Sequence, residues 1–118
     1  MKILIVEDSE PVRRTIKSFI DDLVDEFFEC DDGGEALDAY TQHRPDLVLM
    51  DIKMARMGGL EATRKIKALF PEARVVIVSQ WNDRGLRERA RAAGAENYIS
   101  KADLSPLRDL LQADRQKR

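Results

Sequence analysis

Five side chains of complementary chemistry stand at the ends of strand-like runs in this sequence. Glu7 and Asp8 end the first run, and Asp51, Ser79 and Lys101 follow later ones. Two carboxylates about 4 Å apart repel by about 4 kcal/mol at an effective dielectric constant of about 20, so clustered carboxylates need a proton or a cation. Carboxylate oxygens suit Mg²⁺, and a lysine adds a positive charge that binds carboxylate or phosphate oxygen. If the fold brings these residues together, they form a divalent cation site.

The strands that would position these side chains are visible as short apolar runs. Residues 3–6, 47–50 and 75–78 are rich in β-branched types and lack polar alternation, which is typical of strands buried on both faces. Residues 27–30 and 97–99 contain polar interruptions, as expected for strands nearer the edge of a sheet. The sequence therefore predicts five strands.

Between and after these runs, apolar residues recur at helical spacing. The spacing predicts helices over 12–20, 36–40, 60–69, 86–93 and 104–111. Strands that alternate with helices on so short a cycle form a parallel sheet, because each right-handed crossover lays its helix on the sheet. We therefore expect one doubly wound α/β domain, with a five-stranded parallel sheet and helices on both faces.

The domain is expected to occupy residues 1–118, with an ordered core over about 2–112 and a frayed end at 113–118. In open parallel sheets, ligands bind outside the carboxyl ends of the strands. The five polar side chains fall at those ends, so we expect them to share one site.

Composition excludes several classes of protein. The chain has 118 residues, 43% apolar and 36% charged, with 20 Lys and Arg against 22 Asp and Glu. A net charge of -2 argues against direct nucleic-acid binding by bulk electrostatics. The longest apolar runs contain four residues, far short of the roughly 20 needed to span a bilayer, so no membrane association is expected.

The first residues and the single cysteine indicate the compartment. Acidic Glu7 and Asp8 follow Met1 closely, which does not resemble a secretory signal, so we expect a cytoplasmic protein. Cys30 has no partner cysteine and is predicted to be a buried thiol. His43 has no evident acidic or metal partner and is predicted to be solvated.

The sequence strongly resembles the receiver domains of two-component response regulators, which have a flavodoxin-like fold. The likeness covers about residues 2–112 and combines order, spacing and strand context. Its motifs are Ile-Leu-Ile-Val-Glu-Asp (3–8), Pro-Asp-Leu-Val-Leu-Met-Asp-Ile-Lys-Met (45–54) with Gly59, Val-Ile-Val-Ser (76–79) and Ala-Gly-Ala-Glu-Asn-Tyr-Ile-Ser-Lys (93–101).

The resemblance implies a role for each residue of the set. Asp51 would be the phosphoryl acceptor, with Ser79 and Lys101 in contact with the phosphoryl group. The cofactor would be Mg²⁺, and its ligands would be Glu7, Asp8, Asp51 and the backbone carbonyl of Lys53.

The resemblance also implies a switch and its partners. Ser79 and Tyr98 would move together and alter the surface formed by the fourth helix, the fifth strand and the fifth helix. The donor would be a sensor histidine kinase or a phosphotransfer protein. The signal would pass to a downstream effector, to an output domain in a longer chain, or to a phosphorylation-dependent homodimer. Such a domain is a regulator and not an enzyme.

The sequence departs from the family pattern near the acceptor. Ala55 and Ala102 stand where the family commonly has proline, and Gln80 stands where it usually has a small residue. Gln80 and Trp81 are expected to narrow the opening above Asp51, and Lys53 and Trp81 lie where side chains can reach over a phosphoryl group and tune its hydrolysis.

Two other functions remain open at this stage. A receiver-like module could stay unphosphorylated and act only through protein interactions. A small Mg²⁺-dependent phosphohydrolase is the less favoured alternative, because no general acid or substrate pocket is evident. The sequence also does not decide between a stand-alone regulator and the receiver of a longer regulator with a helix-turn-helix output.

Overall fold

Strands and helices alternate along the chain in the predicted order. The computed structural model describes residues 1–54, 57–81 and 83–117, so Ala55 lies outside the described residues. The elements are β1 (Lys2–Val6), α1 (Glu10–Ile20), the short 3-10 helix η1 (Asp21–Leu23), β2 (Glu26–Cys30), α2 (Ala36–His43), β3 (Leu47–Met50), α3 (Gly59–Leu69), β4 (Val75–Ser79), α4 (Arg84–Ala93), β5 (Asn97–Ser100) and α5 (Ser105–Lys117).

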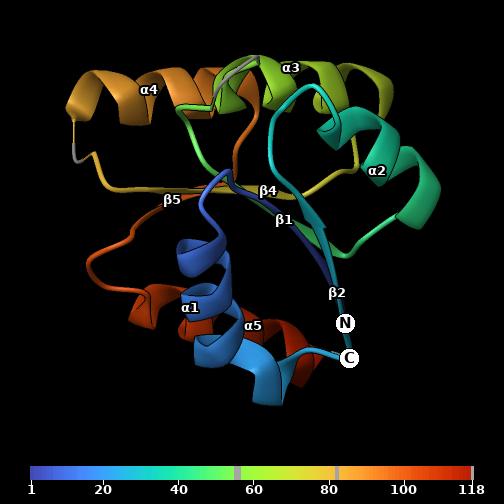
Figure 1. Cartoon of the computed structure of the whole chain (residues 1–118), viewed down its shortest axis with the longest axis vertical. Helices are drawn as coiled ribbons and strands as arrows, with labels where there is room; N and C mark the ends of the chain where they lie inside the picture. Colours follow the sequence, from blue (N-terminus) through green and yellow to red (C-terminus); the bar gives the residue numbers. More distant parts are fainter. Residues whose placement is uncertain (55–56, 82, 118) are drawn as a thin grey trace.

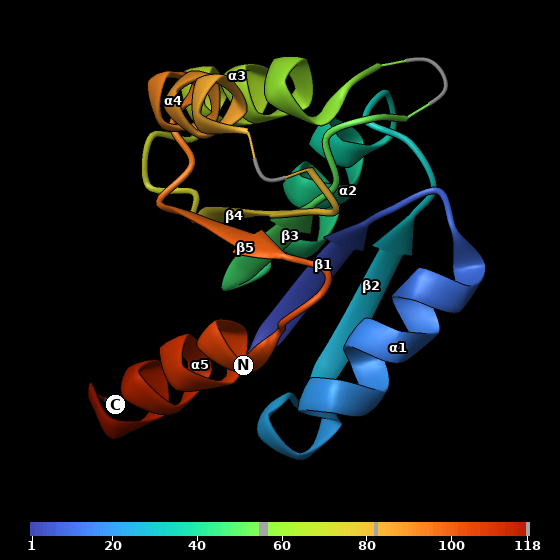
Figure 2. The same cartoon turned by 90° about the vertical axis from the view of Figure 1, so that its left-hand side faces the viewer.

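The strands form one parallel sheet in the order β2-β1-β3-β4-β5. Val6 at the end of β1 is level with Cys30 of β2 and Met50 of β3, and Met50 is level with Ile77 of β4. Figure 2 shows β1 and β2 side by side, with their arrowheads pointing the same way. The carboxyl ends of the strands therefore meet at one edge of the sheet. The two polar-interrupted strands, β2 and β5, lie at its two sides as predicted.

Helices cover both faces of the sheet, as the doubly wound prediction requires. Helices α2, α3 and α4 lie on one side, and α1 and α5 lie on the other (Figure 1). Alternate residues of each strand point to opposite faces, so Leu4 and Val6 pack under the first layer and Ile3 and Ile5 under the second. The fold class predicted from the sequence is confirmed.

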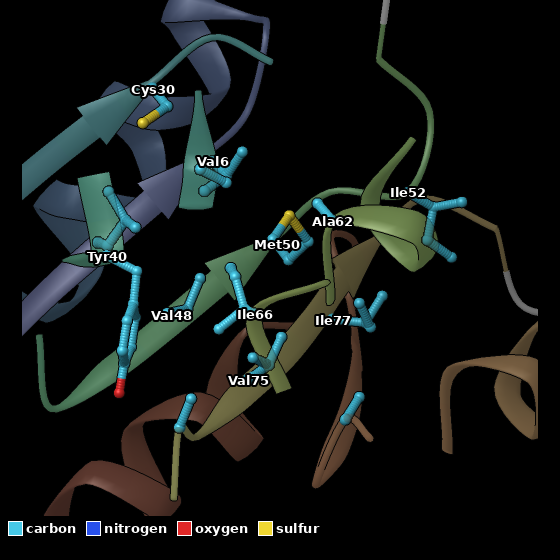
Figure 3. Close-up of a cluster of buried hydrophobic side chains, with 14 of the residues drawn as sticks. Val6, Cys30, Tyr40, Val48, Met50, Ile52, Ala62, Ile66, Val75 and Ile77 are labelled. Atoms are coloured by element: carbon cyan, nitrogen blue, oxygen red, sulfur yellow. The ribbon is translucent and has the colours of Figure 1, made fainter. Parts of the chain in front are cut away.

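The core on the α2–α3–α4 side fixes the strand that carries Asp51. Val48 and Met50 of β3 are fully buried against Ile66 of α3 and Ile77 of β4, and Figure 3 shows these side chains. Each buried side chain of this size contributes about 1.5–3 kcal/mol. Because both faces of β3 are packed, the residue after Met50 has a defined position.

The start of α1 and the end of α4 are each explained by the residue at that position. The Ser9 hydroxyl accepts a hydrogen bond from the Val12 N–H at 3.4 Å and caps α1. Gly94 ends α4 with a φ of 109°, a left-handed conformation that glycine adopts without steric cost. The Lys101–Ala102 peptide bond is trans, as expected for a non-proline residue.

Some sequence predictions differ from the structure. Helix α5 continues through Lys117 instead of fraying after 112, because Asp114 is buried and accepts a hydrogen bond from Arg74 at 2.6 Å. His43 is half-buried and stacks on Phe28 with 3.8 Å between ring centroids, so the prediction of a solvated side chain was wrong. Cys30 is a buried free thiol, as predicted.

No helix within the described ranges has both the length and the apolar character needed to cross a membrane.

Candidate functional site

The carboxylates of Glu7, Asp8 and Asp51 converge at the carboxyl edge of the sheet. Glu7 and Asp8 follow β1, and Asp51 follows the neighbouring strand β3. One oxygen from each lies within 4.8 Å of the others. Glu7 is 3% exposed and Asp51 is 8% exposed, whereas Asp8 is open to solvent. The adjacency of β1 and β3 thus brings together the three carboxylates that the sequence singled out.

Lys101 joins this cluster from the far side of β4. Its Nζ lies 2.6 Å from Glu7 Oε1 and 3.2 Å from Asp51 Oδ1. The Lys101 backbone N–H donates to the carbonyl of Ser79 at 2.9 Å, which anchors the start of the loop after β5 against the end of β4. One ammonium group therefore bridges two buried carboxylates.

The cluster changes the proton affinity of its members. Burial raises the pKa of Glu7 from its ordinary 4.5 to about 7; the hydrogen bond from Lys101 opposes the rise, and the charge of Asp51 adds to it. For Lys101, burial lowers the pKa, but the hydrogen bond to Glu7 and the charge of Asp51 outweigh burial and raise it overall. The lysine is therefore held in its charged form between the two carboxylates.

Backbone groups hold the carboxylates in place. The Ser9 N–H donates to Glu7 Oε2 at 3.1 Å, and the Ile52 N–H donates to Asp51 Oδ1 at 2.9 Å. Arg13 donates from its guanidinium to the Glu7 carbonyl at 2.7 Å. Arg13 was not predicted from the sequence to lie at the site. Its position in the first turn of α1, facing the end of β1, is the one feature from which its contact with Glu7 could have been predicted.

Ser79 and Tyr98 are both linked to Trp81 and not directly to each other. Ser79 is fully buried at the end of β4 and its hydroxyl accepts a hydrogen bond from the Trp81 N–H at 3.0 Å. The Tyr98 hydroxyl donates to the Trp81 carbonyl at 2.6 Å. The predicted switch residues are thus joined through one residue of the β4–α4 loop.

The residues expected to line the opening take distinct positions. Gln80 is exposed, and Trp81 is 42% exposed. Lys53 is also exposed, and its Nζ lies 4.4 Å from the centroid of the Trp81 ring. Lys53 and Trp81 were both expected near the phosphoryl group, but the contact between their side chains was not predicted. The predicted role of the Lys53 carbonyl as a metal ligand stays a prediction.

The donor set fits a hard divalent cation. The converging oxygens belong to carboxylates, and one side chain, Asp8, faces solvent, which leaves room for coordinated water. Mg²⁺ is typically bound through one or two carboxylates while it keeps several waters. Glu7, Asp8 and Asp51 are therefore chemically suited to hold Mg²⁺.

Comparisons with known proteins agree with the fold. The chain matches the family described as the response regulator receiver domain over residues 3–112. It is 36% identical to the response regulator GacA of Pseudomonas aeruginosa over 98% of its own length and 54% of that protein. It is 38% identical to the chemotaxis protein CheY of Bacillus subtilis over 85% of its own length and 84% of that protein.

A solved structure is similar over the whole chain. It is a chain of the CheX–CheY–BeF3–Mg²⁺ complex from Borrelia burgdorferi, with a TM-score of 0.82 and 26% identity over 100% of this chain and 90% of that one. The present chain spans about half the length of the GacA relatives that it matches. The family match covers nearly all of the described fold, and the chain belongs to the response regulator receiver domain family.

Proposed function

We propose that this domain accepts a phosphoryl group on Asp51 with the help of Mg²⁺ and passes the signal through its α4–β5–α5 surface. The single observation that carries the proposal is the cluster in which Glu7, Asp8 and Asp51 converge while Lys101 contacts two of them. Glu7, Asp8, Asp51 and the Lys53 carbonyl would hold the metal. Bound Mg²⁺ would offset the negative charge of the acceptor and of the incoming phosphoryl group.

The chain's own residues supply the remaining chemistry. The Ile52 N–H fixes one oxygen of Asp51, which leaves the other carboxylate oxygen as the nucleophile. As the O–P bond to Asp51 forms, the P–N bond of a phosphohistidine donor breaks and its electron pair leaves with the imidazole nitrogen. Positioning and charge stabilisation are the main demands of phosphoryl transfer, and Lys101 is placed to meet both.

The switch would begin at Ser79. A phosphoryl group adds roughly −1.5 to −2 charges and oxygens that need donors, and the Ser79 hydroxyl is at the end of the strand next to Asp51. Movement of Ser79 would release Tyr98 toward the interior. The output surface includes a hollow of about 200 Å³ whose lining contains Arg87, Arg91 and Tyr98, so rotation of Tyr98 would reshape it.

The partners follow from the same reaction. A sensor histidine kinase or phosphotransfer protein would be the donor, in a cytoplasmic setting. The length of the GacA relatives supports an output region in a longer chain, and a phosphorylation-dependent homodimer is the other candidate readout. The domain would regulate other proteins and would not itself be an enzyme acting on a diffusible substrate.

The test is incubation with acetyl phosphate and Mg²⁺, followed by intact-mass measurement. We expect a gain of one phosphoryl group that is stable in acid, labile in base and absent from Asp51→Asn. Asp38→Asn, an exposed carboxylate on α2, is the matched control and should be modified like the parent protein. Failure of every phosphodonor would overturn phosphoryl acceptance.

Beryllofluoride titration separates this proposal from the unphosphorylated interaction module. Gln80 and Trp81 are exposed and follow β4, the strand beside β3. If they occluded Asp51, there would be no spectral change with beryllofluoride and Mg²⁺. We expect chemical-shift changes at Ser79 and Tyr98. Turnover of a generic phosphate ester would instead favour the phosphohydrolase.

A further inference from the structure

Arg13 of α1 makes two contacts through one guanidinium group. Its Nε donates to Glu29 Oε1 on β2 at 3.0 Å, and its Nη1 donates to the Glu7 carbonyl oxygen at 2.7 Å. The side chain is 17% exposed. Because a guanidinium is planar and rigid, its two contacts depend on one orientation of the group. Arg13 therefore links the residue after β1 to β2 with a defined geometry.

Glu29 is well suited to be the fixed end of this link. Its second carboxylate oxygen accepts a hydrogen bond from Lys17 Nζ at 2.9 Å, one turn further along α1, and Figure 2 shows α1 running beside β2. The hydrogen bond from Lys17, together with that from Arg13, holds the pKa of Glu29 below its ordinary value. The carboxylate is therefore charged at neutral pH and held by two cations.

The other end of the link fixes the peptide group that precedes Asp8. The Glu7 N–H pairs with the Cys30 carbonyl of β2 at 3.0 Å, whereas the Glu7 carbonyl takes its donor from Arg13. The peptide group that follows Asp8 is also held, because the Ser9 N–H donates to Glu7 Oε2 at 3.1 Å. With the backbone fixed on both sides of Asp8, the direction of its side chain is restricted.

Asp8 depends on its backbone more than the other two carboxylates of the cluster do. Glu7 and Asp51 are 3% and 8% exposed, and both contact Lys101. Asp8 is open to solvent, yet one of its oxygens lies within 4.8 Å of oxygens of the other two. Packing does not orient an exposed side chain, so the backbone sets where its carboxylate can reach.

We propose that Arg13 is a positioning residue of the metal site, which holds the Glu7 carbonyl against Glu29 and so directs the Asp8 carboxylate toward Glu7 and Asp51. This inference rests on the proposed Mg²⁺ site. Loss of a group that orients metal ligands typically weakens metal binding by about 10- to 100-fold. Because Arg13 acts through the backbone, we expect the lower end of that range, about tenfold.

Charge alone predicts the opposite result. Arg13 carries a positive charge beside a cluster of carboxylates, so its removal should strengthen the binding of a cation. A weaker affinity for Mg²⁺ after the loss of Arg13 would therefore come from geometry and not from charge.

The first experiment measures Mg²⁺ affinity by calorimetry in Arg13→Met and in the matched control Lys17→Met. Each variant loses one positive charge on α1 and one hydrogen bond to Glu29, but of the two side chains Arg13 alone donates to the Glu7 carbonyl. We expect Mg²⁺ to bind about tenfold more weakly to Arg13→Met and no more weakly to Lys17→Met than to the parent. An unchanged affinity in Arg13→Met, or an equal loss in both variants, would overturn the proposal.

The second experiment needs no metal. In Arg13→Met, the backbone ¹⁵N order parameters of Asp8 and Ser9 should fall from the rigid value of about 0.85 toward the flexible range below about 0.6. In Lys17→Met they should stay at the parent values. Unchanged order parameters in Arg13→Met would show that the backbone around Asp8 is held without Arg13 and would overturn the proposal.

Arg13→Lys keeps the charge and changes the geometry. A single ammonium replaces the planar fork, so it cannot hold Glu29 and the Glu7 carbonyl in the same arrangement. We expect Mg²⁺ to bind about two- to fivefold more weakly than to the parent. An affinity equal to that of the parent would show that a positive charge suffices and would overturn the proposal.

The parent protein separates this proposal from the proposed function. If the parent does not bind Mg²⁺, the metal site itself is overturned, and the role of Arg13 toward the metal is overturned with it. If the parent binds Mg²⁺ and Arg13→Met binds it equally well, the role of Arg13 alone is overturned.

Discussion

Lys101 explains how two buried carboxylates stay close together. Its ammonium contacts both Glu7 and Asp51, so it acts as an internal counterion. A divalent cation would compete with this lysine for the same oxygens. The raised pKa of Glu7 shows that one lysine does not fully offset the burial of the carboxylates. Metal binding should therefore be linked to the proton on Glu7.

The linkage predicts how Mg²⁺ affinity depends on pH. The pKa of Glu7 is about 7 against an ordinary 4.5, so below about pH 7 a proton must leave before the carboxylate can serve as a ligand. We expect the affinity to fall about tenfold for each pH unit below 7 and to level off above it. Calorimetry in buffers of different ionisation enthalpy will count the released proton.

Glu7→Gln is the control for this pH dependence, since it removes the titrating group and should flatten the profile. A profile as steep in Glu7→Gln as in the parent would assign the proton to another group.

The raised pKa of Glu7 also affects the stability of the metal-free protein. Because the pKa of Glu7 is higher when folded, the free energy of unfolding should decrease as pH rises from about 4.5 to about 7.

The residues of the site were predictable to different degrees. Glu7, Asp51 and Lys101 could be identified because they follow strands, and parallel strands bring their carboxyl ends together. Arg13 and the Lys53–Trp81 contact could not be identified, because they depend on side-chain conformations that no local pattern encodes.

At the scale of elements, the first turn of α3 supports the acceptor. A Cβ added to Gly59 would lie 1.8 Å from the Asp51 carbonyl oxygen and 2.9 Å from Met50 Cγ. The helix can therefore start this close to the end of β3 only because Gly59 has no side chain. Gly58, one residue earlier, leaves 3.2 Å to the nearest atom, the Ile52 carbonyl oxygen.

This difference predicts unequal effects of two similar substitutions. Gly59→Ala should push α3 away from β3, lower the free energy of unfolding by about 2–3 kcal/mol or more, and weaken Mg²⁺ binding by displacing Asp51. Gly58→Ala should cost less than about 1 kcal/mol and leave Mg²⁺ binding nearly unchanged. Urea denaturation and Mg²⁺ titration of both variants will check this. Equal losses would mean that the approach of α3 to Asp51 is not limiting.

The strands were also easier to predict than the helix ends. The predicted range 47–50 matches β3, and 75–78 differs from β4 by one residue, because continuous apolar runs end abruptly at polar residues. Helix η1 was missed because Asp21 and Asp22 carry no apolar periodicity. The last turns of α5 were missed because the interaction that orders them joins Asp114 to Arg74, 40 residues away in sequence.

Across the whole molecule, the edge of the sheet at the carboxyl ends of the strands and the opposite edge, at their amino ends, carry different interactions. The carboxyl edge holds the acidic cluster and Lys101. The amino edge holds Arg74, just before β4, which contacts both oxygens of Glu96 at 2.8 and 2.7 Å and Asp114 of α5 at 2.6 Å. At the carboxyl edge three carboxylates lie close together beside one lysine. At the amino edge both carboxylates are paired with Arg74. Stability and chemistry should therefore respond separately to substitution.

Arg74→Met tests this separation. The variant loses both ion pairs and leaves the carboxylate of Asp114, 8% exposed, without its guanidinium. Arg74 is itself 34% exposed, so we expect the free energy of unfolding to fall by a moderate amount, about 1–2 kcal/mol. Mg²⁺ affinity should stay within about twofold of the parent, because sites without shared contacts are usually independent. Urea denaturation and calorimetry measure the two quantities, and a large loss of Mg²⁺ affinity would instead show that the amino edge and the acidic cluster are coupled through the sheet.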